Sequence, residues 1–324
     1  MTREDGILIY LCELKTKIME IKNITVNEKI YKFLQQRYSV AFGNLQKFFR
    51  SKSIKVNGGK ISENYILQKG DVINLNKFAL KILSNSEKKE KTQRRPSQQL
   101  IDKIKKSMIF EDEKILAINK PSGLSAQGGS GIAISLDDVL PYLAGKNVNL
   151  KLVHRLDKDT SGVLVIAKGI AVAEALIQQF KEKGKILKTY LAVVYGRLKN
   201  PEGIINLPLL KRYENDIEKV FVDKYMGKEA ITKYKTLVYN KNFDISLLEV
   251  TILTGRTHQI RVHLKEIGNP VVGDFKYGNL DANKGVCGKM LLHSHKIQME
   301  LDGKAYNLHA PVPASFKKFF AQDF

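Results

Sequence analysis

The sequence has no tryptophan and only two cysteines, Cys12 and Cys287, among its 324 residues. Two cysteines cannot build a disulfide framework, and the sequence offers no Cys-x-x-Cys metal pair. No apolar run approaches the ~20 residues that a membrane-spanning helix needs. The first residues carry acidic groups on both sides of a short apolar run, which does not match a secretory signal. We therefore expect a protein of a reducing compartment, in the cytoplasm and not in a membrane.

Acidic residues are also scarce relative to basic ones. The chain has 33 Asp and Glu against 54 Lys and Arg, which gives a formal net charge of +21. A field of that sign attracts polyanions, so the composition indicates a nucleic acid as the partner. An anionic membrane surface is the weaker alternative.

A polar, highly charged stretch over residues 84–107 divides the sequence. We interpret it as a linker between two modules, because it has almost no large apolar residue before Leu100. This division predicts an N-terminal extension over residues 1–19, a small module over 20–83 and a large module over 108–324.

The small module is predicted to contain two short helices followed by hairpin-like strands. Ile30, Phe33 and Leu34 have the spacing of one helical face, and residues 45–49 repeat that spacing. The strand-like run that follows them leads into Asn57-Gly58, a strong turn signal. This order of elements resembles the S-four-like RNA-binding module, although the Arg-Leu-Asp run that usually opens its first helix is absent.

Basic residues gather at the end of the second predicted helix and in the strand after it, with no acidic residue between them. We expect them to contact an RNA backbone, and the alternative is an ordinary solvated surface. They are Lys47, Arg50, Lys52, Lys55 and Lys60.

The large module alternates short apolar runs with turns and has few helical patterns. Helices are predicted over residues 173–180 and 257–267, where apolar residues recur at helical spacing. This mixture predicts an α+β fold with a mixed or largely antiparallel sheet. The predicted strands cover residues 115–118, 163–167, 190–195, 247–253 and 291–299.

A polar loop directly before the predicted strand 163–167 is the first candidate for chemistry. Asp157 lies in this loop, with cations at positions 155 and 158 that favour the ionised form of its carboxylate. An ionised carboxylate that is held in place can attack a sugar or ring carbon. The alternative is that Asp157 or Asp159 only caps a turn.

A second candidate is the turn at Gly255 and the helix predicted after it. Arg256 lies in the turn, and His258, Arg261 and Lys265 share one face of the helix. Such a face can clamp a phosphate or a carboxylate, and Arg261 could pair with Asp157. The alternative is a basic face turned to solvent.

The histidines raise the question of a metal centre. His258 and His263 are five residues apart and do not share a helix face, whereas His293 and His295 would point to one side of a strand. No His-Glu-x-x-His motif or cysteine partner accompanies them, so we expect no metal.

Six motifs in this module occur in the order found in the RluA family of RNA pseudouridine synthases, which the chain resembles. They extend across about 190 residues, and the S-four-like pattern before them agrees with the resemblance. The motifs are NKPSG at 119–123, HRLDKDTSG at 154–162, KTYLAVVYG at 188–196, TGRTHQIRVHL at 254–264, GDFKYG at 273–278 and LLHSHKI at 291–297.

The resemblance implies a role for several residues. Asp157 takes the place of the family's catalytic aspartate, Tyr190 that of the tyrosine packed against the target base, and Arg261 that of the arginine paired with the aspartate. Arg155 matches the arginine that enters the RNA duplex as the target base leaves it. The remaining expected RNA contacts in this module are His154, Thr160, Arg256 and His258.

The resemblance further implies isomerisation of uridine to pseudouridine in RNA, without a cofactor and by a monomer. Residues 227–230 resemble the branch that acts on large-subunit ribosomal RNA, and transfer RNA is the alternative substrate. Two competing interpretations are a non-catalytic RNA-binding factor of ribosome assembly and a metal-dependent RNA hydrolase.

Overall fold

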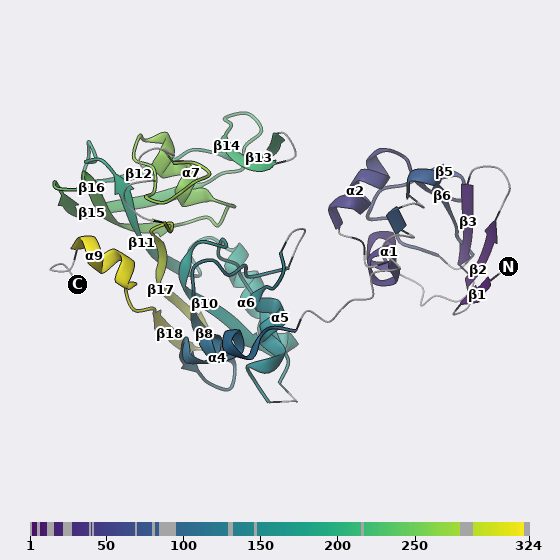
Figure 1. Cartoon of the computed structure of the whole chain (residues 1–324), viewed down its shortest axis with the longest axis horizontal. Coiled ribbons are helices and arrows are strands. Elements are labelled where there is room, and N and C mark those ends of the chain that lie inside the picture. Colours follow the sequence, from purple (N-terminus) through teal and green to yellow (C-terminus); the bar gives the residue numbers. More distant parts are fainter. Residues whose placement is uncertain are drawn as a thin grey trace. The chain divides into compact units, whose positions relative to one another are not determined.

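A computed structural model shows that the chain divides into two compact units, with the boundary between Arg94 and Arg95 (Figure 1). Each unit is considered by itself. Both cysteines and residues 84–94 of the predicted linker lie outside the part that the structure describes. That part comprises residues 2–4, 7–11, 16–21, 28–38, 40, 42–68, 70–79, 82–83, 95–128, 132–145, 148–214, 217–278 and 288–320.

The first unit contains a six-stranded antiparallel sheet in the order β1-β2-β3-β6-β4-β5, accompanied by the helices α1 and α2. Its core includes Ile30, Leu34, Leu45 and Phe48, all fully buried. The elements are β1 (Thr2–Glu4), β2 (Ile7–Leu11), β3 (Thr16–Ile21), α1 (Ile30–Tyr38), α2 (Phe42–Arg50), β4 (Ile54–Val56), β5 (Gly59–Lys60) and β6 (Val72–Asn76).

The two helices and the strands after them occur in the predicted order. Asn57 and Gly58 have φ angles of 51° and 74°, the left-handed conformation that a tight hairpin turn requires. The sheet, however, begins before residue 20, the expected start of the module. β3 pairs with β6 in antiparallel register, so residues 16–21 belong to this sheet and not to a separate extension. The alternation of apolar residues in this segment is short. Its strand conformation depends on pairing with β6, which lies some fifty residues later in the chain.

The second unit is built on a ten-stranded mixed sheet. Its order is β12-β15-β16-β11-β17-β10-β8-β7, with β18 paired to β17 and β9 paired to β10. The strands are β7 (Met108–Glu111), β8 (Ile115–Lys120), β9 (Leu150–Leu152), β10 (Ser161–Lys168), β11 (Leu187–Tyr195), β12 (Glu202–Asn206), β15 (Ile231–Asn240), β16 (Ile245–Ile252), β17 (Leu292–Leu301) and β18 (Lys304–His309). A separate hairpin joins β13 (Leu209–Glu214) to β14 (Ile217–Val222).

Few helices accompany this sheet, as an α+β fold predicts. Residues 98–106, which the sequence analysis placed in the linker, form α4, whose Ile101 and Ile104 are buried in the core of this unit. These two side chains are three residues apart and therefore lie on one face of an otherwise polar helix. The helices are α4 (Gln98–Lys106), α5 (Leu136–Val139), the 3-10 helix η1 (Leu140–Tyr142), α6 (Ile170–Lys181), α7 (Gln259–Glu266) and α9 (Ala314–Phe320). None of the helices in the described ranges is long and apolar enough to cross a bilayer.

A glycine allows β10 and β17 to approach at the centre of the sheet, where they form a parallel pair. Gly162 has a φ of 111°, and a Cβ at this position would lie 2.1 Å from the carbonyl oxygen of Ser294. No other residue therefore fits here without a backbone shift. The close approach fixes the start of β10, directly after the loop that holds Asp157.

Candidate active site

The loop between β9 and β10 carries Asp157 and is hydrogen-bonded to a buried lysine. Lys120, at the end of β8, has no exposed surface and donates hydrogen bonds to the carbonyl oxygens of Pro121, Leu124 and Lys158, at 3.0, 2.8 and 3.1 Å. Burial lowers the pKa of Lys120 to about 8, although the charges of Asp159 and Asp157 oppose this shift. The lysine thus connects the end of one strand to the loop that presents Asp157.

Two further hydrogen bonds join this loop to the segment after β8. The amide of Gly123 donates to the carbonyl of Lys158 at 2.9 Å, and the hydroxyl of Ser122 donates to the carbonyl of Asp159 at 2.8 Å. A turn within the loop is closed by the amide of Thr160, which donates to the carbonyl of Asp157 at 3.1 Å. Backbone contacts therefore fix the position from which the Asp157 side chain projects.

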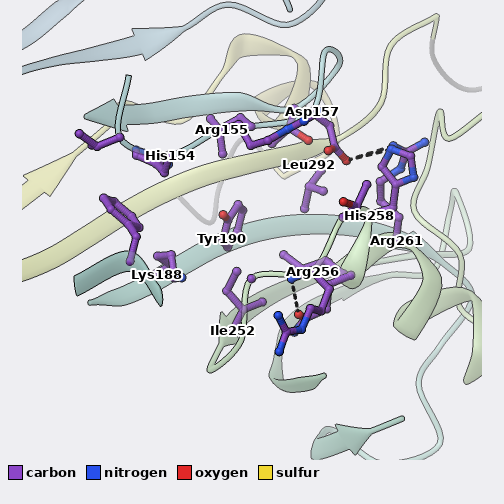
Figure 2. Close-up of a pocket in the computed structure, with 18 of the residues that line it drawn as sticks. His154, Arg155, Asp157, Lys188, Tyr190, Ile252, Arg256, His258, Arg261 and Leu292 are labelled. Atoms are coloured by element: carbon purple, nitrogen blue, oxygen red, sulfur yellow. Dashed lines mark hydrogen bonds and ion pairs between the residues drawn. The ribbon is translucent and has the colours of Figure 1, made fainter. Parts of the chain in front are cut away.

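The carboxylate of Asp157 accepts a hydrogen bond from Arg261 on α7, with 3.1 Å between Oδ2 and Nη1 (Figure 2). Arg261 is itself held by Asp274, whose two oxygens accept from Nε at 2.7 Å and from Nη2 at 2.8 Å. Burial opposes the charge on Arg261, but the hydrogen bonds and charge of Asp274, together with Asp157, raise the pKa of the guanidinium above its ordinary value. Arg261 is therefore a permanent cation beside Asp157.

Helix α7 is anchored at its first turn, which makes the position of Arg261 precise. The Gln259 side chain accepts from the Arg256 amide at 3.0 Å and donates to the Ile231 carbonyl at 3.0 Å. His263 is fully buried. Its Nδ1 lies 2.9 Å from the Thr232 hydroxyl, and its Nε2 lies 2.9 Å from the Leu207 carbonyl oxygen. These contacts attach the first turn and the middle of the helix to β15 and to the segment after β12.

His258 approaches Asp157 from the start of α7. Its Nε2 lies 3.8 Å from Oδ2 of Asp157, and its Nδ1 lies 2.7 Å from the hydroxyl of Tyr277. His258 has a φ of 54°, a left-handed conformation that is uncommon for a residue with a side chain and concentrates at functional sites. Burial lowers the pKa of His258 to about 4, although Asp157 opposes the shift, so the ring is neutral at pH 7.

A pocket of about 320 Å³ opens beside Asp157, and Tyr190 of β11 lines it. Tyr190 is 8% exposed, and burial, followed by the charge of Asp157, raises the pKa of its hydroxyl. The phenol is therefore neutral and offers a ring face as well as a polar group. Leu292 and Ile252 supply apolar surface on either side of it (Figure 2).

His154, one of the expected RNA contacts, is also tied to the protein at the pocket wall. Its Nε2 accepts the backbone amide of Val165 at 2.8 Å, and its ring stacks on Phe180 with 4.3 Å between centroids. Burial, together with the charge of Lys188, lowers the pKa of His154 to about 3. It lines the pocket as a neutral residue that joins the loop to β10.

The structure brings eight of the predicted site residues to one pocket, from three separate segments of the chain. Lys265, expected on the same helix face, instead pairs with Glu266 and lies away from the pocket. Histidines 293 and 295 contact Ser161 and the Ala310 carbonyl, and no cluster of three metal-ligating side chains occurs within the described ranges. The eight are His154, Arg155, Asp157, Thr160, Tyr190, Arg256, His258 and Arg261.

Sequence reasoning gave no role to Lys120, Lys188, Asp274 or Tyr277, although all four lie within the motifs that carry the family resemblance. The residues at the end of α2 and after it, Lys47, Arg50, Lys52 and Lys55, are exposed on the first unit. Lys60 is exposed there as well.

The chain is similar to known proteins in both sequence and fold. A family model described as RNA pseudouridylate synthase matches residues 114–266. The chain is 39% identical over 307 residues to ribosomal large subunit pseudouridine synthase C of Rickettsia felis, which covers 93% of this chain and 98% of that protein. The protein of the same name from Rickettsia bellii is 39% identical over 305 residues, or 91% of this chain and 99% of the relative. The solved structure of human RNA pseudouridylate synthase domain containing 4 shares the fold, with a TM-score of 0.59 at 24% identity, over 69% of this chain and 95% of that one.

Proposed function

The chain belongs to the RNA pseudouridylate synthase family, and we propose that it converts specific uridines of large-subunit ribosomal RNA to pseudouridine with Asp157 as the reacting carboxylate. The names of its relatives support the choice of ribosomal RNA, since the chain covers nearly their whole length. The activity itself, isomerisation of uridine in RNA, is that of the family.

The reaction balances within the nucleoside. The bond between N1 of uracil and C1′ of ribose breaks, the base rotates, and C5 forms a new bond to C1′. C5 loses its hydrogen as a proton, and N1 gains one. No electron or phosphoryl group is transferred, so the chemistry requires a carboxylate and a positioned base but no cofactor.

The observation that carries the proposal is the contact between Asp157 and Arg261 at the wall of a nucleoside-sized pocket. An arginine held by a second carboxylate stays charged and orients the carboxylate of Asp157 towards the pocket, and a nucleophile or a base needs such a fixed position. From this position Asp157 is suited to attack C1′ of the sugar, to attack C6 of the ring, or to remove a sugar proton. The first and third routes place the ribose of the target next to the carboxylate of Asp157, and the second places the uracil ring there.

The target uridine must leave its stack before it reaches the pocket, at a cost of a few kcal/mol. The ring of Tyr190 offers a surface for the extruded base, and stacking of this kind is worth about 1–3 kcal/mol. Arg155 is exposed at the mouth of the pocket and is suited to fill the gap that the base leaves. One chain supplies all of these side chains, which supports action as a monomer, and we expect this to occur in the cytoplasm.

We further propose that the first unit is an S-four-like RNA-binding module. The order of α1, α2 and the β4–β5 hairpin supports this, as does the exposed basic cluster of Lys47, Arg50, Lys52 and Lys55. A cluster that contacts phosphates would add affinity without sequence choice.

Mapping pseudouridines in total RNA tests the proposed substrate. Cells that lack the gene should lose specific pseudouridines from large-subunit ribosomal RNA, and the intact gene should restore them. The Asp157→Asn gene serves as the matched control and should restore none. Loss confined to transfer RNA, or no loss in any RNA, would contradict the proposal.

A further inference from the structure

Lys188 lies on β11 two residues before Tyr190, and both side chains line the same pocket (Figure 2). Side chains alternate along a strand, so these two face one side at a separation of about 7 Å. The pocket therefore continues along β11 beyond the place proposed for the target base. Lys188 contributes a positive charge to that end.

No carboxylate pairs with Lys188 anywhere in the described ranges. Its cross-strand neighbours are Ile252 on β16 and Ile297 on β17, both apolar. The ammonium lies 5.7 Å from the centroid of the Phe180 ring, and burial lowers the pKa of the lysine. A partly desolvated cation without a counter-ion is costly to the fold, unless the partner is a ligand.

Arg261, at the other end of the same pocket, shows the opposite arrangement. Its charge is balanced by Asp274 and Asp157, with 2.7 Å to the first and 3.1 Å to the second. Asp157 is the single carboxylate among the residues that line the pocket, whereas Arg155, Lys181, Lys188 and Arg256 add positive charge. Lys188 thus carries an uncompensated charge at the end of the pocket away from Arg261 (Figure 2).

The surroundings of Lys188 favour an anion over a second stacked base. One face of Phe180 is already covered by His154, whose ring lies nearly parallel to it, at 19°. The hydrogen bond from the Val165 amide fixes His154 in turn. Phe180 therefore offers the ammonium a fixed ring face but no hydrogen-bond acceptor, so the N–H groups of Lys188 are available to a ligand.

We propose that Lys188 binds a phosphodiester group of the RNA that directly flanks the target uridine. The inference rests on the proposed function, because it takes the position of the uridine from Asp157 and Tyr190. The ammonium is a point charge with three donors, which suits a phosphate oxygen. Lys188 is a substrate-binding residue in this scheme, and it would set where the backbone enters the pocket.

The test combines a protein variant with a modified RNA. Lys188→Met keeps the apolar stem and removes the charge, and Lys317→Met on α9 is the matched control. Lys317 is exposed, and α9 packs on Leu191 and Val193, which face away from Tyr190 on β11. The RNA is an oligonucleotide that carries a mapped target uridine, made with normal phosphates or with a neutral methylphosphonate at the 5′ or the 3′ flanking position.

We expect Lys188→Met to weaken binding of the normal RNA about tenfold and to reduce the salt dependence by about one phosphate contact. At one of the two flanking positions, methylphosphonate should weaken wild-type binding about tenfold and Lys188→Met binding by less than twofold. The thermal unfolding midpoint of Lys188→Met should not fall, because the substitution removes an unpaired charge. Lys317→Met should bind both kinds of RNA like the wild type.

Two results would overturn the proposal: wild-type affinity in Lys188→Met, or equal losses from methylphosphonate in both proteins at both positions. The wild-type response to methylphosphonate remains informative even if the variant folds poorly. Pseudouridine formation by the wild-type protein in the normal oligonucleotide reports the proposed function separately. If the wild-type protein forms pseudouridine in the normal oligonucleotide but methylphosphonate weakens binding of both proteins equally, only the inference about Lys188 is rejected.

Discussion

Asp274 holds Arg261 through two parallel hydrogen bonds, with 2.7 Å from Nε and 2.8 Å from Nη2 to the two carboxylate oxygens. This fork-to-fork geometry occupies one edge of the guanidinium and leaves Nη1 directed at Asp157. The side chain of Asp274 is 1% exposed and that of Asp157 is 19% exposed. The two carboxylates that contact Arg261 therefore have different roles. The buried Asp274 orients the guanidinium, and the more accessible Asp157 faces the pocket.

Asp157→Asn should abolish pseudouridine formation, by about a thousandfold or more, because an amide is neither a nucleophile nor a base. RNA affinity should stay within a few fold, since the amide oxygen can still accept from Arg261. Release of tritium from RNA labelled at C5 of uridine measures turnover. Asp159→Asn, an exposed neighbour in the same loop, is the control and should retain activity. Normal turnover by Asp157→Asn would remove Asp157 from the chemistry.

Tyr190→Phe should keep activity within about fivefold, because the ring face is retained and the hydroxyl, with its raised pKa, is not ionised. Tyr190→Ala should lose about 10- to 100-fold, which corresponds to the loss of base stacking. Single-turnover rates and RNA affinities of the two variants separate these effects. A collapse of activity in Tyr190→Phe would instead assign proton transfer to the hydroxyl.

Asp274→Ala should lower the free energy of unfolding by about 3–5 kcal/mol, because it leaves the buried Arg261 with one partner instead of two. Urea denaturation measures the change. Asp302→Ala is the matched control, since it breaks an exposed pair with Lys114 at 2.6 Å and should cost less than about 1 kcal/mol. Equal effects of the two substitutions would contradict the structural role of Asp274.

The stability of the fold should fall as the pH is lowered from about 6.5 towards 4. Burial lowers the pKa of His293 to about 4, and the unfolded chain takes up this proton near pH 6.5. Unfolding therefore binds a proton in this window, and the contribution of His293 is complete at pH 7 and is lost at lower pH. His154 and His258, with pKa values lowered to about 3 and about 4, act in the same direction.

Urea denaturation at pH 7 and pH 5 measures this dependence. His293→Gln should flatten it by on the order of 1–2 kcal/mol. A wild-type protein equally stable at both pH values would refute the neutral, buried state of these histidines.

The basic cluster of the first unit should supply affinity and salt dependence rather than turnover. Replacing Lys47, Arg50, Lys52 and Lys55 together by Gln should reduce the slope of log affinity against log salt by about 0.7–0.9 for each phosphate that the protein no longer neutralises. The rate at saturating RNA should change little. Lys77→Gln, at an exposed position of the same unit, is the control. An unchanged slope in the fourfold variant would assign RNA binding to the second unit alone.

The spacing of side chains was sufficient to predict the elements that present the site. The polar loop before β10 and the basic first turn of α7 depend on near neighbours in the sequence, as do α1 and α2 of the first unit. Helix α4 was missed because its apolar edge is only a few residues long. Strands β1 to β3 were missed because β3 joins the sheet through β6, with β2 and β1 added in turn, and short alternation alone does not determine a partner.

Composition and local pattern thus determined the charge, the α+β class and the loop that carries Asp157. Only the tertiary structure decided which groups meet there, because Arg261 is 104 positions from Asp157 in the sequence. The close approach of β10 to β17 at Gly162 likewise joins segments that are far apart in the chain. The same is true of Lys120 beneath the loop, of Asp274 behind Arg261 and of Lys188 without a counter-ion. A side chain's partner depends on which strands become neighbours, and that is settled by packing the whole sheet and not by any single window of sequence.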